Sequence, residues 1–332
     1  MATIKDVAKE AGVSVATVSR VVNKSPKASK AAIESVNTAM KKLSYRPNAN
    51  ARALVNKSTN TIGVLVADVS DPFFGALIKA VDIVARKNNK HLLIGNGYHD
   101  AKTEKDAIEL LMNSQCDSLI IHSKGLTDKE LCYFAEEVPG LVIINRHVPE
   151  LAKRCISLNN ELGSQIATEH IINHGHQHLA YINSNQNIDD CHHRRSGYIK
   201  ALQIHNVVIN ESLIVEGDPT DKGGERAMNE LLNKNIPFTG VICYNDYMAA
   251  GAISALEKAK ILVPQTVSIM GFDDGIIAKY LHPKLSTIQY PIQDMAQLAA
   301  NLSLALAKGE LNDSKGDIFT PTLIERNSVT HL

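Results

Sequence analysis

The residues best suited to bind a small ligand follow the apolar runs in the second part of the chain. We expect these runs to be strands of a parallel sheet, and such sheets bind ligands beyond the carboxyl ends of their strands. Carboxylate, amide and guanidinium groups can hold several hydroxyls, and aromatic faces cover the C–H surface of a sugar. The side chains that meet this description are Asp71, Phe73, Phe74, His122, Asn145, Arg146, Arg194, Asn245, Asp273 and Tyr290.

Each of these residues also has a structural alternative. Asp71 and Asn245 could cap the helices that follow them, and Arg194 could face the solvent. We expect Asp246 and Asp274 to be the structural members of their acidic pairs. Because the candidates follow strands in two separate parts of the chain, their convergence favours a binding cleft over a set of unrelated caps.

Other clusters give weaker indications. Residues 174–178 (HGHQH) and 191–193 (CHH) carry metal-ligating residue types, but no paired cysteines stand at zinc spacing, so the sequence predicts no metal site. The chain lacks a Walker A loop, the G-x-G-x-x-G spacing and a G-x-S-x-G elbow. The lack of a phosphate loop or a nucleophile–base pair counts against an α/β enzyme acting on a sugar or nucleotide.

The elements that must position the cleft begin at Thr61, where apolar β-branched runs alternate with amphipathic helices. This alternation predicts parallel sheets wound on both faces, and its restart after Ser157 predicts two similar lobes. The expected strands are 61–68, 91–96, 118–122, 141–145, 179–183, 213–217, 240–244, 267–274, 286–291 and a last strand, 318–326, that returns to both halves. The expected helices are 75–88, 103–114, 129–138, 161–174, 192–205, 221–233, 247–258 and 292–306.

The first part of the chain predicts two short helices joined at a glycine turn. Thr3 followed by Asp6 can form a capping box, and Gly12 ends the first helix. Ser14 can cap a second helix over 15–22. Two short helices with this turn are typical of a helix-turn-helix.

A third helix is expected after Ser29. In it Ile33, Val36, Met40 and Leu43 would form the inward stripe of a three-helix core.

Charge divides the chain in the same way. The chain of 332 residues has no net charge. Its length and its hydrophobic content of 44% suffice for two or three domains, each with a hydrophobic core. Up to Ser58 there are eleven Lys and Arg residues against three Asp and Glu residues, so the remainder carries the acidic excess. A basic head on an acidic body is typical of a protein that holds a polyanion such as nucleic acid at one end.

The sequence also indicates where the protein works. The first residues, MATIKDVAKE, lack the apolar segment of a secretory signal, and no apolar run is long enough to span a bilayer. The five cysteines are scattered and odd in number, which indicates reduced thiols. We therefore expect a cytoplasmic protein without a membrane partner, and these features count against a sugar carrier of the transport type.

The sequence of the head is more specific than its helical pattern. Residues 2–23 (ATIKDVAKEAGVSVATVSRVVN) and 43–54 (LSYRPNANARAL) closely resemble the LacI/GalR family of bacterial repressors. The resemblance implies an all-α helix-turn-helix head on a two-lobed α/β core like that of periplasmic binding proteins. The implied domains are a DNA-binding head at 1–47, a hinge helix at 48–58, and an effector-binding and dimerisation core at 59–332, with one lobe at 59–157 and 291–318 and the other at 158–290 and 319–332.

The resemblance also implies roles for single residues. Contacts with DNA are expected from Thr3, Ser14, Val15, Ala16, Thr17, Ser19, Arg20, Asn23, Ala51 and Leu54. Hydroxyls and amides of this set suit phosphate, Arg20 suits guanine, and Val15 with Ala16 suits thymine methyls. In the family the hinge helix enters the minor groove and Leu54 stands at the position of the wedge leucine.

In the core, the family motifs DPFF, R-x-x-G-[YW], ND and FDD line the sugar cleft. Here they correspond to Asp71–Phe74, Arg194 with Gly197 and Tyr198, Asn245–Asp246, and Phe272–Asp274.

The sequence around these motifs resembles that of the galactose repressors of the family, which also have Val-Ala at the start of the reading helix. The resemblance thus implies a homodimeric repressor of a galactose utilisation operon, bound to double-stranded operator DNA, with D-galactose as its inducer and no cofactor. A different sugar or a purine as effector is the alternative within the same mechanism.

Overall fold

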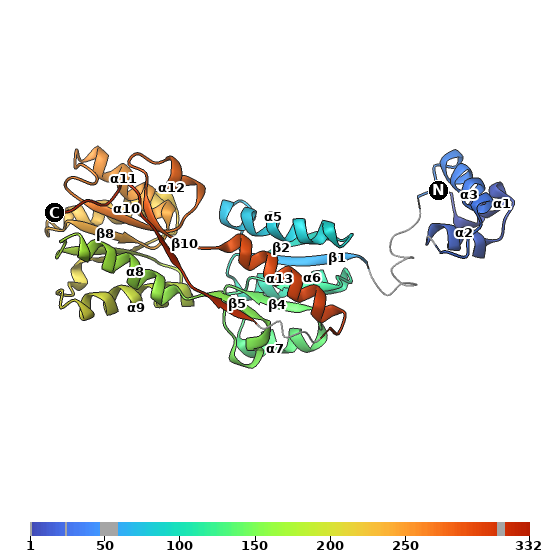
Figure 1. The fold of residues 1–332 in the computed structure, drawn as a ribbon, viewed down its shortest axis with the longest axis horizontal. Helices are drawn as coiled ribbons and strands as arrows, with labels where there is room; N and C mark the ends of the chain where they lie inside the picture. Colours follow the sequence, from blue (N-terminus) through green and yellow to red (C-terminus); the bar gives the residue numbers. More distant parts are fainter. Residues whose placement is uncertain (1, 24, 47–58, 311–315) are drawn as a thin grey trace. The chain divides into compact units, whose positions relative to one another are not determined.

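The computed structural model describes residues 2–23, 25–46, 59–310 and 316–332 of a chain that divides into two units (Figure 1). The first, here called the head, comprises the first 61 residues with the turn Gln115–Asp117, and the remainder forms the core. The expected hinge helix at 48–58, with Ala51 and Leu54, lies outside the described residues.

The head contains α1 (Ile4–Ala11), α2 (Val15–Val22) and α3 (Lys30–Lys42). The expected capping box is confirmed, because the side chain of Thr3 accepts the N–H of Asp6 and the Asp6 carboxylate accepts the N–H of Thr3. The start and end signals between the first two helices are confirmed as well: Gly12 ends α1 with φ 67°, and the Ser14 hydroxyl caps α2.

The core of the head is small and almost entirely aliphatic. Its buried residues are Val7, Ala8, Val18, Val21, Val36 and Ala39. The prediction that Ile33 belongs to this core is wrong, because its side chain is 38% exposed. The inward stripe of α3 runs through the partly buried Ala32 and the buried Val36 and Ala39 at helical spacing, and Ile33 lies to one side of it.

The first lobe of the core is built on one six-stranded sheet. The strand order is β11-β5-β4-β3-β1-β2, and β1, β3, β4, β5 and β11 run parallel. Its strands are β1 (Thr61–Val66), β2 (His91–Asn96), β3 (Ser118–Ile121), β4 (Leu141–Ile144), β5 (Cys155–Leu158) and β11 (Asp317–Phe319). Its helices are α5 (Pro72–Lys87), α6 (Ala101–Asn113), α7 (Asp128–Glu137) and α13 (Ile292–Ala307), with a 3-10 segment at Pro149–Arg154.

The second lobe repeats this plan. The strand order is β12-β10-β9-β8-β6-β7, parallel except that β12 pairs antiparallel with β10. Its strands are β6 (Leu179–Ser184), β7 (Ile214–Gly217), β8 (Gly240–Cys243), β9 (Ser268–Asp273), β10 (Ser286–Gln289) and β12 (Thr322–Ile324). Its helices are α8 (Asn160–Asn173), α9 (Asp189–Ile204), α10 (Asp221–Asn233), α11 (Asp246–Lys258) and α12 (Ile276–Tyr280), with a short 3-10 turn at Glu211–Leu213.

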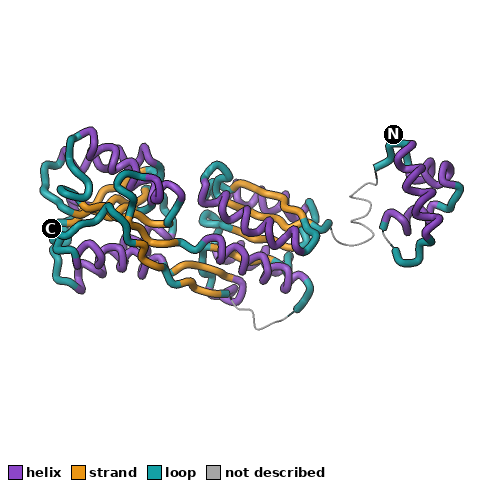
Figure 2. The backbone as a smooth tube through the Cα atoms, turned by 45° about the horizontal axis from the view of Figure 1, so that its top comes forward, coloured by secondary structure: helices purple, strands orange, loops and turns teal. Residues whose placement is uncertain are grey.

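The chain passes back and forth between the two lobes. Figure 2 shows each sheet as a layer with helices packed on it, and the chain crosses between the sheets after β5, after β10 and after β11. The expectation of doubly wound parallel sheets in two lobes is therefore confirmed. Among the described residues no helix has the length and apolar character needed to cross a membrane.

Two parts of the strand prediction are wrong. β5 was not expected, because its four residues, CISL, are too short and too polar to stand out as an apolar run. The expected single strand at 318–326 is two short strands, one in each sheet. Pro321 between them has no backbone N–H to donate, so a continuous ladder cannot pass through it.

Close packing of α8 against α9 positions one wall of the interlobe cleft. A Cβ atom added at Gly197 of α9 would meet the carbonyl oxygen of Glu161 and lie 2.9 Å from the amide nitrogen of Gln165, both on α8. The absence of a side chain at Gly197 therefore lets the two helix backbones approach. This approach brings the side chain of Arg194 on α9 to Asn160, the first residue of α8.

We expect Gly197→Ala to destabilise the core by about 1–3 kcal/mol or more, because the overpacked contact is with backbone atoms that cannot rotate away. Gly75→Ala is the matched control, since an added Cβ there meets nothing within 4 Å and Gly75 lies inside α5. That change should stabilise the protein by about 0.5–1 kcal/mol. Urea unfolding of both variants measures the difference, and equal stabilities would contradict the packing argument.

Candidate ligand cavity and DNA-reading head

Strands of both sheets end at one cavity of about 480 Å³ between the lobes. The loops after β1, β2, β3 and β4 line it from the first lobe, and the chain after β6, β7, β8 and β10, with the last residue of β9, lines it from the second. This position and this volume are usual for small-molecule sites on parallel sheets. Of the residues expected at the site, the cavity brings together Asp71, Phe73, Phe74, His122, Asn145, Arg194, Asn245, Asp273 and Tyr290.

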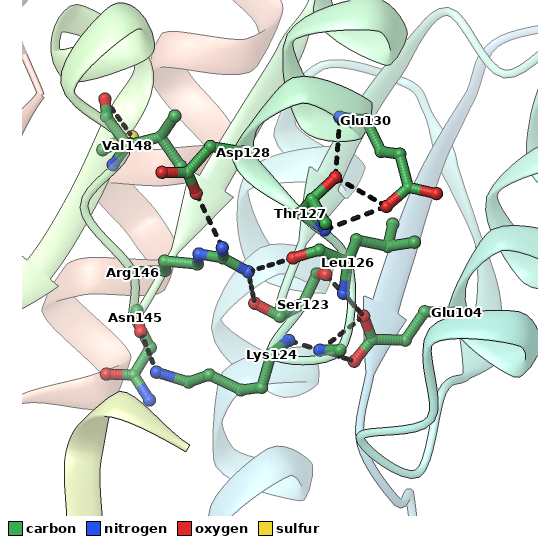
Figure 3. A network of polar contacts seen from close by, with 12 residues as sticks. Glu104, Ser123, Lys124, Leu126, Thr127, Asp128, Glu130, Asn145, Arg146 and Val148 are labelled. Atoms are coloured by element: carbon green, nitrogen blue, oxygen red, sulfur yellow. Dashed lines mark hydrogen bonds and ion pairs between the residues drawn. The ribbon is translucent and has the colours of Figure 1, made fainter. Parts of the chain in front are cut away.

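Arg146 is the exception, and its assignment to the ligand site is wrong. Its guanidinium pairs with Asp128 at 2.6 Å and donates to the carbonyl oxygen of Leu126 at 2.7 Å, on the far side of the loop before α7 (Figure 3). Asn145 explains the divergence, because its φ of 60° turns the chain directly after β4. The two neighbouring side chains therefore leave the strand in different directions, and only that of Asn145 enters the cavity.

Two other motif residues are also structural. Gly197 permits the approach of two helices, as described above. Tyr198 is buried inside the second lobe, where its hydroxyl donates to the carbonyl oxygen of Leu179 at 3.1 Å and its ring stacks on Tyr181 at 4.7 Å. The part of the R-x-x-G-[YW] motif that reaches the cavity is therefore Arg194 alone.

Asp246 and Asp274 hold the second lobe together, as expected. The Asp246 carboxylate accepts the N–H of Gly275 at 2.7 Å and the hydroxyl of Thr287 at 2.6 Å. Burial raises the pKa of Asp246 to about 7, although these two hydrogen bonds oppose the shift. Asp274 pairs with Arg326 at 2.5 Å.

Arg194 is the most enclosed charge of the cavity wall, at 4% exposure. It donates through Nε to Asn160 at 2.9 Å and through Nη1 to the carbonyl oxygen of Tyr244, and its Nη2 lies 3.6 Å from Asp273. The guanidinium carbon also lies 3.7 Å from the ring centroid of Phe272, a cation–π contact. The side chain is thus held in one orientation before any ligand arrives, which lowers the entropic cost of binding.

A buried ion pair joins the lobes beside Arg194. The ammonium of Lys124, from the loop after β3, lies 2.8 Å from the carboxylate of Asp190 on α9, and their side chains are 1% and 8% exposed. Asp190 also accepts from the amides of Asn145 at 3.1 Å and Asn160 at 3.3 Å. Burial opposes the charge on Asp190, but Lys124 and Arg194 outweigh it and lower the pKa of this carboxyl.

The loop that carries Lys124 is fixed by a second buried carboxylate. Glu104, at the start of α6, accepts the backbone N–H groups of Lys124, Gly125 and Leu126 at 3.0–3.1 Å, and the hydroxyl of Ser123 at 2.5 Å (Figure 3). Arg146 holds the same loop from its other side through the carbonyl oxygen of Leu126. These contacts orient the side chain of Lys124 toward the second lobe.

Aromatic rings and neutral imidazoles form the first-lobe wall of the cavity. Phe73 packs edge-on against Phe74 at 5.2 Å and against Tyr290 at 5.1 Å, and Phe74 packs against His122 at 4.8 Å. Burial, with Lys124 nearby, lowers the pKa of His122 well below its usual value, so the ring is neutral at pH 7. Within the described part of the chain its Nδ1 is buried without a hydrogen-bond partner, which leaves a polar atom for a ligand to satisfy.

Asp71 and Asn245 each cap a helix and also line the cavity, and Asp273 lines it as well. Asp71 caps α5 through the N–H of Phe73 at 2.9 Å, and Asn245 caps α11 through the N–H of Met248 at 2.8 Å, yet both line the cavity. Burial raises the pKa of the Asp71 carboxyl, and it raises that of Asp273 well above the usual value although Arg194 opposes it. The structural and the ligand-binding alternatives are therefore compatible.

Sequence patterns alone do not identify Lys124 and Asp190 as members of the site. The helix containing Asp190 was expected to start at 192, which left Asp190 in a loop with an adjacent acid. Lys124 follows a short strand, as many solvated lysines do. The available signal was position, because both residues follow strand ends in the same way as the residues that were identified.

The head presents one exposed face of α2. Val15, Ala16 and Arg20 are exposed on it, while Val18 and Val21 are buried on the opposite side. The other residues expected to contact DNA in the described chain are Thr3, Ser14, Thr17, Ser19 and Asn23, of which the last four lie on or beside α2. A hydrogen bond of 2.9 Å joins the hydroxyls of Ser14 and Thr17, and Asn23 donates to Ser19 at 3.3 Å.

Comparison with known proteins finds one family model that matches the head and one that matches part of the core. The model of bacterial regulatory proteins of the lacI family matches residues 3–48, and that of the periplasmic binding protein-like domain matches residues 168–329. The HTH-type transcriptional regulator GalR of Escherichia coli K12 is 49% identical over 330 residues, which cover 99% of this chain and 96% of GalR. The regulator GalS of Salmonella typhimurium is 50% identical over 99% of this chain and 97% of its own.

Solved structures agree with these matches. The lac repressor dimer bound to operator and an anti-inducer superimposes with a TM-score of 0.87 and 26% identity, over 99% of both chains. A complex of the regulator CelR with cellobiose gives a TM-score of 0.73 and 27% identity, over 99% of this chain and 100% of its own. A helix-turn-helix head on a two-lobed core with an interlobe cavity defines a ligand-responsive DNA-binding regulator. The chain belongs to the LacI family of bacterial transcriptional regulators, and it is not an enzyme.

The buried pair allows a direct measurement of how the lobes are joined. Asp190→Asn and Lys124→Met should each destabilise the core by about 3–5 kcal/mol, because each leaves one buried charge without its partner. The double variant should cost less than the sum of the two. The exposed pair Arg195–Glu211 serves as the control, with an expected coupling of about 0–1 kcal/mol. Additive losses for Lys124 and Asp190 in urea unfolding would show that they do not interact.

Proposed function

We propose that this protein represses a galactose utilisation operon and leaves its operator when D-galactose binds the core. The observation that carries the proposal is the interlobe cavity, whose polar groups come from both lobes of a chain with a DNA-reading head. Relatives that are about half identical over nearly the whole chain are named GalR and GalS, which favours galactose over another sugar or a purine.

The chemistry of the cavity suits an uncharged polyol. Among the described residues that line it, Arg194 is the one Lys or Arg side chain, and it is already engaged by Asn160 and Asp273. Asp71 and Asp273 offer acceptors for hydroxyl groups, and the Phe73 and Tyr290 rings offer surfaces for sugar C–H groups. Five carboxylates from the two lobes line the same cavity, so a phosphorylated sugar or another anion would be repelled.

The proposed switch is a linkage between two binding equilibria. A sugar that touches both lobes stabilises the arrangement in which Lys124 reaches Asp190. If the operator favours a different arrangement of the lobes, each ligand weakens the other by the same factor, typically 1–3 kcal/mol or about 5- to 150-fold. No cofactor is required for such a switch.

On the DNA side we propose that α2 of each subunit lies in the major groove. Arg20 would read guanine, and Val15 with Ala16 would contact thymine methyls. The roles of Ala51 and Leu54 in the minor groove rest on the family resemblance, because both residues lie outside the described part of the chain. Such a protein works on DNA in the cytoplasm.

A homodimer is part of the proposal, because a palindromic operator matches a two-fold pair of heads. The first lobe exposes an apolar edge formed by Ile83 of α5, Leu93 and Ile94 of β2, and Leu110 of α6, each 37–63% exposed. Both α5 and α6 pack against β2, so the four side chains lie in the same region of the surface. β2 is also the last strand of its sheet, so it can meet a second copy.

Operator binding at several salt concentrations, with and without D-galactose, tests the proposal. We expect galactose to weaken binding to a palindromic operator about 5- to 150-fold, with glucose and fucose as comparison sugars. Arg194→Ala should bind the operator normally but lose about 10- to 100-fold in galactose affinity and respond accordingly less. Its neighbour Arg195→Ala is the control, because Arg195 pairs with Glu211 at the surface. Operator binding that is unchanged at saturating galactose would refute the proposed inducer.

Light scattering tests the dimer. Ile94→Asp places a charge in the apolar edge, so we expect monomers and a marked loss of operator affinity. Val208→Asp is the control, since Val208 is 83% exposed outside that edge. A dimeric Ile94→Asp protein with normal operator affinity would place the subunit contact elsewhere.

A further inference from the structure

A second cluster of possible ligands lies in the second lobe, away from the residues that line the cavity. His170 and His174 occupy positions i and i+4 on the last turn of α8 and its cap, and Glu325 follows β12. One ligand atom from each of these residues lies within 4.8 Å of the others. Two imidazoles four residues apart on a helix share one face and suit a transition metal ion.

The inner ligand of this cluster has an unsatisfied polar atom. His170 is 8% exposed, and its Nε2 is buried without a hydrogen-bond partner in the described structure. Buried polar atoms without partners are rare in native proteins, and each calls for a physical explanation. A bound cation that accepts the nitrogen lone pair would satisfy it.

The second histidine is oriented in the manner of a metal ligand. Nδ1 of His174 lies 2.8 Å from the carbonyl oxygen of His170, so Nδ1 carries the proton and donates it. The lone pair of His174 is then on Nε2. This use of one ring nitrogen to fix the tautomer and orient the other is typical of zinc-binding histidines.

The segment near residue 331 restrains the same ring. His331 stacks on His174 with ring centroids 4.2 Å apart, and the N–H of Leu332 donates to the carbonyl oxygen of His174 at 3.0 Å. By contrast, both nitrogens of His176 are engaged, with Thr239 at 3.0 Å and with the carbonyl oxygen of Thr330 at 2.9 Å. The ligand set is therefore not the consecutive HGHQH run, which explains why the sequence predicted no site.

From this geometry we propose that His170, His174 and Glu325 form a site for one divalent transition metal ion, with Zn²⁺ as the preferred occupant. Two imidazoles and a carboxylate are an established zinc donor set that leaves the fourth position to water. Ligation at about 2.0–2.2 Å requires each donor atom to shift by no more than about 1 Å, which side-chain rotation can supply. Glu325 is exposed and His174 half-buried, so the ion can enter from solvent.

A metal at this position would tie the end of α8 to the segment after β12. The strand before that segment, β12, packs against α8 although the two elements are far apart in sequence. An ion that binds the folded lobe and not the unfolded chain raises the unfolding temperature. The site is independent of the proposed response to galactose.

The test uses the full-length, untagged protein after removal of metals with a chelator. Titration with ZnCl₂ should show one ion per chain by calorimetry, an increase in unfolding temperature, and with CoCl₂ the visible absorption of a low-coordinate Co²⁺ site. His174→Ala and Glu325→Gln should each weaken Zn²⁺ binding at least about tenfold, because loss of even an indirect partner commonly costs 10- to 100-fold. These positions are used because replacement of the buried His170 would disturb the core.

His178→Ala is the matched control, because it removes an exposed imidazole four residues beyond His174 on the same lobe. Its Zn²⁺ affinity should equal that of the unchanged protein within about twofold. A single cooperative urea-unfolding transition of each metal-free variant shows that its core is folded. No stoichiometric Zn²⁺ binding, or equal weakening by His174→Ala and His178→Ala, would overturn the proposal.

Discussion

The arrangement of the core depends on charges that are buried between its lobes. Removing an ammonium or a carboxylate from water costs several kcal/mol, and only close pairing with further hydrogen bonds offsets this. Lys124 and Asp190 satisfy the condition, because Glu104 fixes the backbone on one side while Asn145 and Asn160 complete the coordination of Asp190. Separation of the lobes would return both charges to water, and their hydration would offset much of the lost attraction. The ion pair therefore stabilises the joined lobes by less than its short distance suggests. Such a contact is well suited to a protein whose lobes must move.

Two polar residues of the cavity wall also have a structural role. Asp71 and Asn245 satisfy free N–H groups at the start of two helices, and both residues also line the cavity. Capping fixes each side chain in one rotamer, so a sugar would meet acceptors that are already oriented. The same link restricts evolution of specificity, because a change at either position that alters ligand preference also removes a helix cap.

The sequence was a good guide to the elements and to most of the cavity. Apolar runs separated by amphipathic segments gave the order of strands and helices, and the strand-end rule located nine of the ten proposed ligand contacts, from Asp71 to Tyr290. The sequence predictions failed where the direction of a side chain depends on the local backbone conformation and not on the hydrophobic pattern. The direction of Arg146 follows from a positive φ at Asn145, and Ile33 lies beside a buried stripe that it was expected to join. Lys124 and Asp190 could not be paired, since residues 66 positions apart meet only after both lobes have formed.

Interleaving of the two sheets has a consequence for synthesis of the protein on the ribosome. β11 and β12, separated by only Thr320 and Pro321, complete different sheets, so the first lobe lacks an edge strand until Phe319 has emerged and the second until Ile324 has emerged. The three-helix head needs none of these residues and can fold as soon as it leaves the exit tunnel. A prematurely released chain would therefore carry a finished DNA reader on an unfinished sensor. Exposed sheet edges on such a fragment would mark it for chaperones and proteases before it could occupy DNA without control.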